Sequence, residues 1–136
     1  MTIKVTTNGP FLTVDALDVL AEADLPTLFK AFETASRAGP FVVLTDTTSM
    51  KSSPRQVISA FAEGLKRMPS LSKIWLGNAV VVNSPAVRFV LSTLLIVAPM
   101  PTEVKVFDQK LEARRWLGSI LGREGISLPP QLLKAG

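Results

Sequence analysis

Serine and threonine hydroxyls are concentrated between Asp46 and Ser53, and they are the side chains of this sequence best suited to recognition or modification. The segment follows an apolar run and ends at a Ser-Pro pair, which is typical of a helix start. Free N–H groups at a helix start favour anions, and a phosphoryl group here would add about −1.5 to −2 charges. The alternative is that Ser53 caps the helix and the other hydroxyls satisfy backbone groups of a loop. The candidate recognition or modification residues are Asp46, Thr47, Thr48, Ser49, Lys51, Ser52 and Ser53.

A second polar group follows the next apolar run of the chain. Asn83 and Ser84 precede Pro85, and Arg88 lies one helical turn further on. If the two apolar runs are parallel strands, both polar groups lie at the edge of the sheet where ligands of α/β proteins bind. Arg88 could hold an anion there. Alternatively, Ser84 caps a helix and Arg88 is a solvated surface side chain.

The composition excludes several kinds of enzyme. The chain has no His and no Cys, which removes zinc sites with nitrogen and sulfur ligands, thiolate nucleophiles and catalytic triads with an imidazole base. It also lacks the glycine motifs that bind dinucleotides and nucleotide phosphates. Asp46 is the one carboxylate at a promising strand end, and no acidic partner lies near it in sequence. We therefore expect no enzymatic activity, no metal and no cofactor.

Two periodicities predict the elements that position these residues. Residues 3–7 and 11–17 alternate around Asn8-Gly9, a strong hairpin signal, and continuous apolar runs at 41–44, 79–82 and 104–107 are typical of buried strands. Apolar residues at helical spacing predict helices near 25–38, 54–68, 86–98 and 111–121, the first of them capped by Asp24.

The alternation of strands and helices predicts one α/β domain. We expect a mixed sheet of about five strands, largely parallel, with an antiparallel hairpin at its N-terminal edge and about four helices. The domain is expected to span residues 1–125, and residues 126–136, which contain Pro129-Pro130, to form a C-terminal tail.

The predicted helix from Ala86 is apolar on almost all sides. One stripe suits the core, whereas the remaining apolar positions fall largely outside it and need a second cover. That cover could be the C-terminal tail, a second copy of the chain or another protein, or an apolar ligand. The candidate interface residues are Phe89, Thr93, Ile96, Val97 and Met100.

Charge is distributed unevenly along the chain. Residues 1–50 hold three bases and six acids, whereas residues 51–136 hold twelve bases and five acids. No nucleic-acid-binding motif accompanies this charge, so we expect a solvated face or an acidic protein partner and no nucleic acid.

The N-terminus lacks the apolar segment of a signal peptide, and the longest apolar stretch, 89–100, is too short to span a membrane. We therefore expect a cytoplasmic protein without a transmembrane segment.

The chain resembles the SpoIIAA-like branch of the STAS/SEC14 superfamily. The resemblance rests on three stretches, Val42–Asp46, Ala79–Val82 and Val104–Asp108, the last followed by the helix pattern Glu112–Leu117. It implies a bacterial, non-enzymatic module of STAS-like fold. Relatives include antagonists of anti-sigma factors that are switched by phosphorylation of a serine, and SEC14-type proteins that bind lipids. The chain lacks the Asp-Ser-Ser-Gly pattern of the first group, so no phosphorylation site carries over.

Two functions follow as expectations. The first is a regulatory or adaptor module that acts through protein–protein contacts, self-associates as a dimer and is switched by phosphorylation of the Ser/Thr segment. The alternative is a carrier that binds an apolar or lipid-like small molecule between the second face of the helix from Ala86 and the tail.

Overall fold

A five-stranded mixed sheet forms the centre of the protein. The structure is a computed structural model that describes residues 2–97 and 100–126. Its strands are β1 (Ile3–Asn8), β2 (Phe11–Val19), β3 (Phe41–Ser52), β4 (Trp75–Val81) and β5 (Val104–Phe107). They lie in chain order, with β1 antiparallel to β2 and β2 to β5 parallel. The predicted mixed sheet with its N-terminal hairpin is confirmed.

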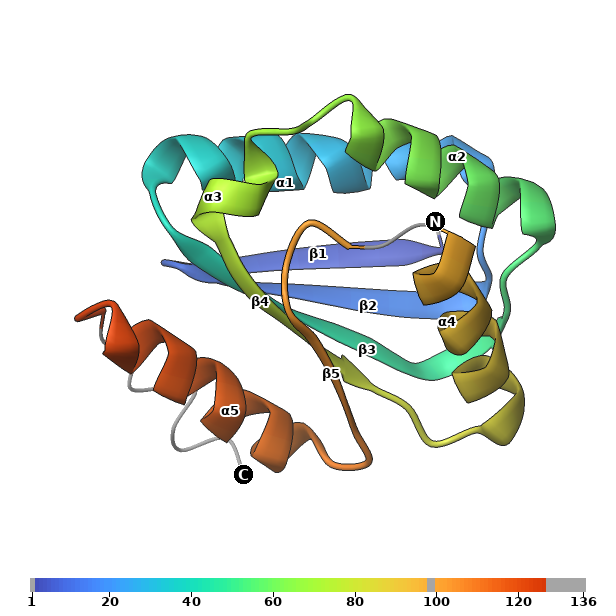
Figure 1. Ribbon diagram of the computed structural model, residues 1–136. Coiled ribbons are helices and arrows are strands. Elements are labelled where there is room, and N and C mark those ends of the chain that lie inside the picture. The colour runs from blue at the N-terminus through green and yellow to red at the C-terminus, as the bar shows by residue number, and fades with distance from the viewer. Residues whose placement is uncertain (1, 98–99, 127–136) are drawn as a thin grey trace.

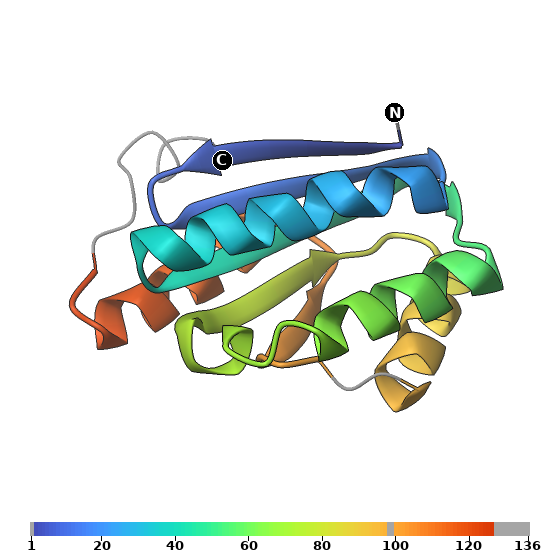
Figure 2. The same ribbon diagram turned by 90° about the horizontal axis from the view of Figure 1, so that it is seen from above.

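The helices form two layers on the sheet. They are α1 (Leu25–Ala38), α2 (Arg55–Lys66), the short α3 (Leu71–Ile74), α4 (Pro85–Val97) and α5 (Lys110–Arg123), with a 3-10 turn at Glu22–Asp24. Because the parallel strands follow one another in order, right-handed crossovers place α1 and α2 on the same face. Figures 1 and 2 show these two helices side by side above the sheet, α5 beneath it and α4 at one end.

Side-chain alternation along β3 and β4 divides the core into two parts. Val43 packs with α1, α2 and Trp75 on one face, whereas Val42 and Leu44 pack with α5 on the other. Trp75 is buried between Phe32 and Phe41, at ring-centroid distances of 4.7 and 5.9 Å. Both faces of the central strands are therefore covered, which explains their continuous apolar sequences.

The hairpin turn differs from the predicted one by one residue. Asn8 pairs with Phe11, so the two loop residues are Gly9 and Pro10 and not Asn8 and Gly9. Gly9 has φ of 60°, which suits the first loop position of a type II′ turn. Pro10 lacks an N–H and has a fixed negative φ, and it therefore occupies the second loop position.

Two predicted helix caps use their side chains in other ways. Asp24 precedes α1 as predicted, but its carboxylate accepts hydrogen bonds from the backbone N–H and the hydroxyl of Thr2, both at 2.6 Å. Pro54 occupies the cap position of α2, and no side chain caps that helix. The interpretation of Ser53 as a cap is therefore wrong.

The described residues include no helix with both the length and the apolar character needed to cross a membrane. The boundary expected at residue 125 between domain and tail stays a prediction, because residues 127–136 lie outside the described part of the chain.

Gly64 on α2 lies against the ring of Phe29 on α1, which makes it a test of this packing. A Cβ atom there would lie 2.1 Å from Cζ of Phe29. We expect Gly64→Ala to lower the free energy of unfolding by about 1–3 kcal/mol, because the ring must move out of its contact. Urea unfolding followed by circular dichroism measures the change.

Gly122→Ala is the matched control, since Gly122 lies in α5 with open space around the added Cβ. Replacement of this helical glycine is expected to raise the free energy of unfolding by about 0.5–1 kcal/mol. Equal effects of the two substitutions would show that Phe29 does not pack on Gly64 as described.

Candidate functional site

The polar residues that follow the apolar part of β3 do not form a loop. Residues 46–52 continue the strand and pair with the second half of β2, from Asp15 to Val19, with two register shifts. The sequence interpretation ended the strand at Leu44 because the apolar run ends there. The correction has a physical reason, since β2 extends far enough to supply backbone hydrogen bonds to these polar residues.

Alternation along β3 sends the first polar residues to opposite faces of the sheet. Asp46 points to the face of α5, where Lys110 Nζ lies 3.2 Å from its Oδ2. Thr45 and Thr47 point to the face of α1 and α2 and line a cavity there. Side chains that are neighbours in the sequence, and that we expected to act together, therefore lie on opposite faces of the sheet.

Asp46 is a structural carboxylate at the start of this polar segment. Its Oδ1 accepts hydrogen bonds from the N–H and the hydroxyl of Thr48, at 2.9 and 2.7 Å. Burial raises the pKa of Asp46, but these bonds and Lys110 lower it by more, so the pKa lies below its usual value. The side chain is only 12% exposed, and each of its two oxygens already has a partner in the protein.

The middle of the segment is exposed. The register shifts leave Thr48, Ser49, Lys51 and Ser52 open to solvent, and Lys51 Nζ lies 3.3 Å from the exposed Asp18 on β2. These four residues lie beyond the end of β4, whose last residue pairs with Asp46. A role of these residues in recognition or modification stays a prediction.

Thr47 and Ser53, the other two members of the predicted segment, face inward. Thr47 is 7% exposed, and its hydroxyl donates a 2.7 Å hydrogen bond to the Val81 carbonyl. Ser53 lines the same cavity as Thr47. The Thr47 hydroxyl is therefore buried, whereas Ser53 is partly exposed where it lines the cavity.

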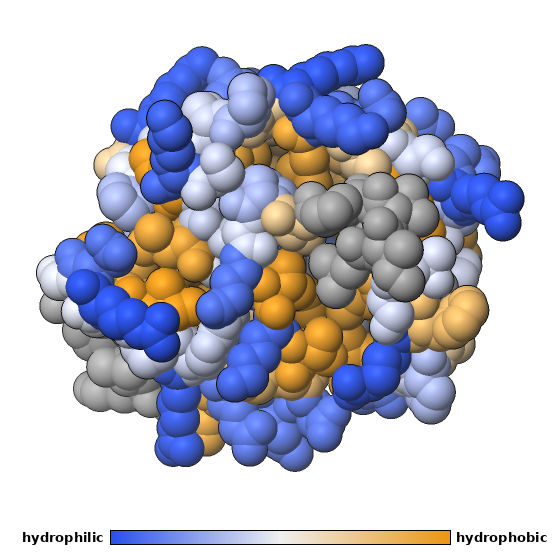
Figure 3. Space-filling model, in the orientation of Figure 1, coloured by the Kyte–Doolittle hydropathy of each residue, from blue (hydrophilic) through white to orange (hydrophobic). Residues whose placement is uncertain are grey.

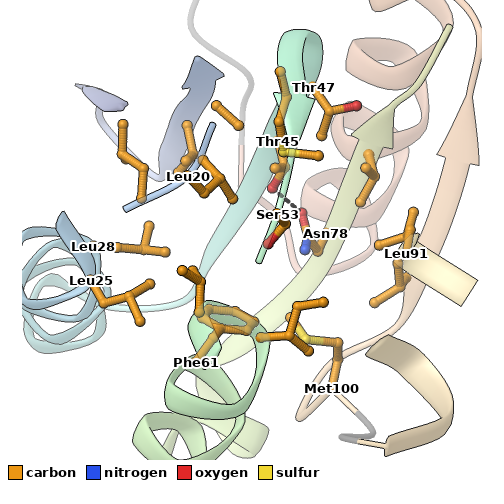
Figure 4. A pocket seen from close by; sticks show the side chains of 18 of the residues that line it. Leu20, Leu25, Leu28, Thr45, Thr47, Ser53, Phe61, Asn78, Leu91 and Met100 are labelled. Atoms are coloured by element: carbon orange, nitrogen blue, oxygen red, sulfur yellow. Dashed lines mark hydrogen bonds between the residues drawn. The ribbon is translucent and has the colours of Figure 1, made fainter. Parts of the chain in front are cut away.

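The cavity lies between the sheet and the helices α1, α2 and α4 (Figure 4). Its volume is about 140 Å³ and its wall is mostly apolar. Thr45 and Asn78 project into it from neighbouring strands, and the Thr45 hydroxyl donates a 2.9 Å hydrogen bond to Asn78 Oδ1. The cavity is partly open to solvent.

The sequence did not indicate that Thr45 and Asn78 line a cavity. The apolar run predicts a strand that begins at Ala79, which leaves Asn78 outside it, and Thr45 directly follows the run that ends at Leu44. The signal was present, because an amide between the apolar residues Leu76 and Ala79 is unusual for a strand covered on both faces.

The start of α4 gives Ser84 and Arg88 partners within the protein, and the anion contact of Arg88 stays a prediction. Arg88 pairs with the exposed Asp108, at 3.1 Å, and so already has an anionic partner. The Ser84 hydroxyl accepts a 3.4 Å hydrogen bond from the N–H of Val87, as a helix cap does. Asn83 is exposed.

The outer face of α4 carries the most exposed large apolar side chain of the described residues. Phe89 is 74% exposed, and Thr93, one turn further on, is also exposed. Val87 and Leu91 pack inward near Met50 of β3. The side chains of Ile96 and Val97 lie outside the described part of the structure, and Met100 lines the cavity.

The first residue of the expected tail packs far from α4. Ile126 contacts the core beneath the sheet, among residues of α5. Figure 3 shows a further apolar area in the middle of the face seen in Figure 1, where β5 runs, surrounded by hydrophilic side chains. The partly buried Val104 and Val106 lie on that strand.

Comparison with known families identifies this combination of sheet and helices. The SpoIIAA-like family profile matches residues 11–118. The chain belongs to the SpoIIAA-like family.

Solved structures agree on the SpoIIAA-like fold. A protein of the DUF3478 family from Shewanella loihica PV-4 is 20% identical, with a TM-score of 0.60 over 85% of this chain and 91% of that chain. An anti-sigma factor antagonist from Mycobacterium paratuberculosis is 14% identical, with a TM-score of 0.53 over 85% and 92%. The anti-sigma factor antagonist SpoIIAA in its unphosphorylated form is 15% identical, with a TM-score of 0.54 over 91% and 99%. A search of curated protein sequences finds no match.

The lowered pKa of Asp46 predicts how its contribution to stability depends on pH. Because the folded-state pKa lies below the ordinary value of 3.8, the contribution is complete above that value and is lost as the pH falls through the folded-state pKa. We expect Asp46→Asn to lower the free energy of unfolding by about 1–2 kcal/mol near neutral pH. Urea unfolding of both proteins, from neutral pH to below 4, should show the difference shrinking.

Asp108→Asn is the control, because it removes an ion pair whose carboxylate is 79% exposed. Its effect at neutral pH is expected to stay below about 1 kcal/mol. A difference between wild type and Asp46→Asn that grows as the pH falls would contradict the assigned contacts.

Proposed function

We propose that this member of the SpoIIAA-like family is a non-enzymatic regulatory module that acts through protein–protein contacts in the bacterial cytoplasm. Two of the solved structures with this fold are described as anti-sigma factor antagonists, a role carried out by binding another protein. The observation that carries the proposal is the exposed aromatic side chain of Phe89 at the end of the sheet where the polar part of β3 also lies.

The proposed contact surface has two adjacent parts. One is the outer face of α4, with Phe89 and Thr93, and the other is the exposed end of β3, from Thr48 to Ser52. They are neighbours because the inner face of α4 packs near Met50, within that part of β3. A second copy of the chain is the partner that we assign to the α4 face, where an exposed phenylalanine in each copy can be removed from water.

The end of β3 is the proposed point for regulation by charge. Among its hydroxyls, Thr47 and Ser53 face inward and the Thr48 hydroxyl is bonded to Asp46. Ser49 and Ser52 are therefore the candidates for phosphorylation. A phosphate there would offset the positive charge of Lys51 and of Arg55 in the first turn of α2, and so weaken binding of an acidic partner.

Substitution of Phe89 tests the contact through α4. We expect the wild-type chain to be a dimer and Phe89→Lys to be a monomer with unchanged circular dichroism, because a buried contact cannot accept an unpaired ammonium group. Size-exclusion chromatography with light scattering measures both masses. Thr34→Lys adds the same charge at an exposed site on α1 and should leave the dimer intact. A monomeric wild type, or a Phe89→Lys variant that stays dimeric, would contradict the proposal.

Phosphorylation of the β3 end has its own test. Purified protein is incubated with ATP in a lysate of its source organism, recovered and analysed by peptide mass spectrometry. We expect phosphate on Ser49 or Ser52, and none within residues 41–66 of the Ser49→Ala/Ser52→Ala variant. Thr6→Ala is the control, since this exposed hydroxyl lies on β1. Phosphate on Thr47 or Ser53, or its absence from the whole segment, would exclude this mode of regulation.

A second candidate function, carriage of a small apolar molecule, is favoured by the cavity alone. The sequence interpretation placed such a ligand between α4 and the tail. The cavity offers an apolar space at a different place, between the inner faces of α1, α2 and α4 and the sheet.

A further inference from the structure

The size of the cavity limits what it can hold. Its volume of about 140 Å³ is close to that of an engineered cavity of about 150 Å³ that binds benzene. Pockets for drug-sized ligands run from roughly 300 to 1,000 Å³. The space therefore suits a molecule of about one ring and is too small for a long acyl chain.

The wall of the cavity limits the charge of its occupant. None of the described residues that line it is ionisable, and the wall consists of apolar side chains apart from Thr45, Thr47, Ser53 and Asn78. A carboxylate or ammonium group placed there would lose its hydration without gaining an opposite charge. We therefore expect any molecule bound in the cavity to be uncharged.

The polar part of the wall contains one hydrogen-bond donor of fixed orientation, the side-chain amide of Asn78. The Thr45 hydroxyl donates to Asn78 Oδ1 at 2.9 Å, which turns the Nδ2 group of this amide away from Thr45 (Figure 4). Among the described residues, no hydrogen bond engages Asn78 Nδ2, although Asn78 is only 6% exposed. Nδ2 is not one of the fully buried, unpaired side-chain atoms of the described residues, so it keeps some accessible surface, and an acceptor within the cavity can form a hydrogen bond with it.

The two remaining hydroxyls differ in what they can contribute. The Thr47 hydroxyl is already engaged with the Val81 carbonyl and serves the backbone of β4. Ser53 makes no hydrogen bond with another described residue, and it lies at the junction of β3 and α2 with partial exposure. It is therefore positioned to contact the polar end of a molecule that enters the cavity.

We propose that the cavity binds an uncharged molecule of about one ring, whose hydroxyl or carbonyl oxygen accepts a hydrogen bond from Asn78 Nδ2. The apolar ring fills the space between the sheet and α1, α2 and α4. The proposal rests on the second candidate function and is independent of the contact through Phe89. A failed ligand test would therefore leave the protein-contact function standing, and a monomeric wild type would leave the ligand site standing.

Direct titration tests the site with phenol and benzene as probes. Each is added to the full-length, ¹⁵N-labelled protein, and the dissociation constant is taken from amide chemical shifts. We expect saturable, mutually competitive binding, with the shifts centred on residues that line the cavity. Phenol should bind more tightly than benzene, about 2- to 10-fold, which is the ratio that one net hydrogen bond supplies.

A shape-preserving double variant tests the polar part of the site. Thr45→Val/Asn78→Leu replaces both members of the hydrogen-bonded pair by apolar groups of similar size, which folded proteins tolerate better than loss of one partner. Its preference for phenol over benzene should disappear, while benzene binding is kept. Thr93→Val, the same type of change on the exposed face of α4, should leave both constants unchanged.

A filled cavity tests the location of the site. Ala16 is buried on β2 and lines the cavity, so Ala16→Leu should remove binding of both probes. If that variant does not fold, the smaller change Ala16→Val should weaken both constants at least several-fold.

Three results would overturn the proposal. The first is the absence of saturable shifts with either probe up to their solubility limits. The second is an unchanged preference for phenol in the double variant. The third is palmitate that displaces phenol from the cavity and binds more tightly than it, since a charged, long-chain ligand contradicts both the size and the charge derived from the wall.

Discussion

Coverage of β3 and β4 on both faces is the constraint on which the rest of the structure depends. Successive side chains of these central strands point to opposite layers, so each layer receives every second residue. Val43 joins the core under α1 and α2, and Val42 and Leu44 join the core above α5. The same alternation continues into the polar residues, where it assigns Asp46 to the lower layer and Thr45 and Thr47 to the upper one. A shift of one residue in register would exchange all of these roles.

The helix α4 links the two functional parts of the molecule. Its inner face contributes Val87 and Leu91 to the wall of the cavity, and its outer face carries the exposed Phe89. It also packs near Met50, within the part of β3 that extends beyond β4. Any contact made by Phe89 and any molecule held in the cavity therefore act on the same helix from opposite sides.

Sequence reasoning predicted the fold well and the site less well, for identifiable reasons. Continuous apolar runs and helical spacing located the parallel strands and the four longer helices, because burial sets both patterns. The extension of β3 was missed because it depends on the length of its neighbour β2 and not on its own polar sequence. The inward orientation of Thr47 was not predicted because it follows from alternation along a strand that continues past Leu44, and the sequence places a loop there. Asn78 was missed because β4 begins at Trp75, before the continuous apolar run that predicts the strand. The cavity itself arises from side chains of eight different strands and helices and leaves no local pattern in the sequence.

Hydrogen–deuterium exchange on the full-length protein, in dilute and in concentrated solution, tests most directly the claim that the protein acts through the end of its sheet. The account predicts that slowed exchange on association is confined to α4 and to residues 48–53, with α1, α5 and β1 unchanged. Protection on the outer faces of α1 or α5, or along β1, with none on α4, would contradict it.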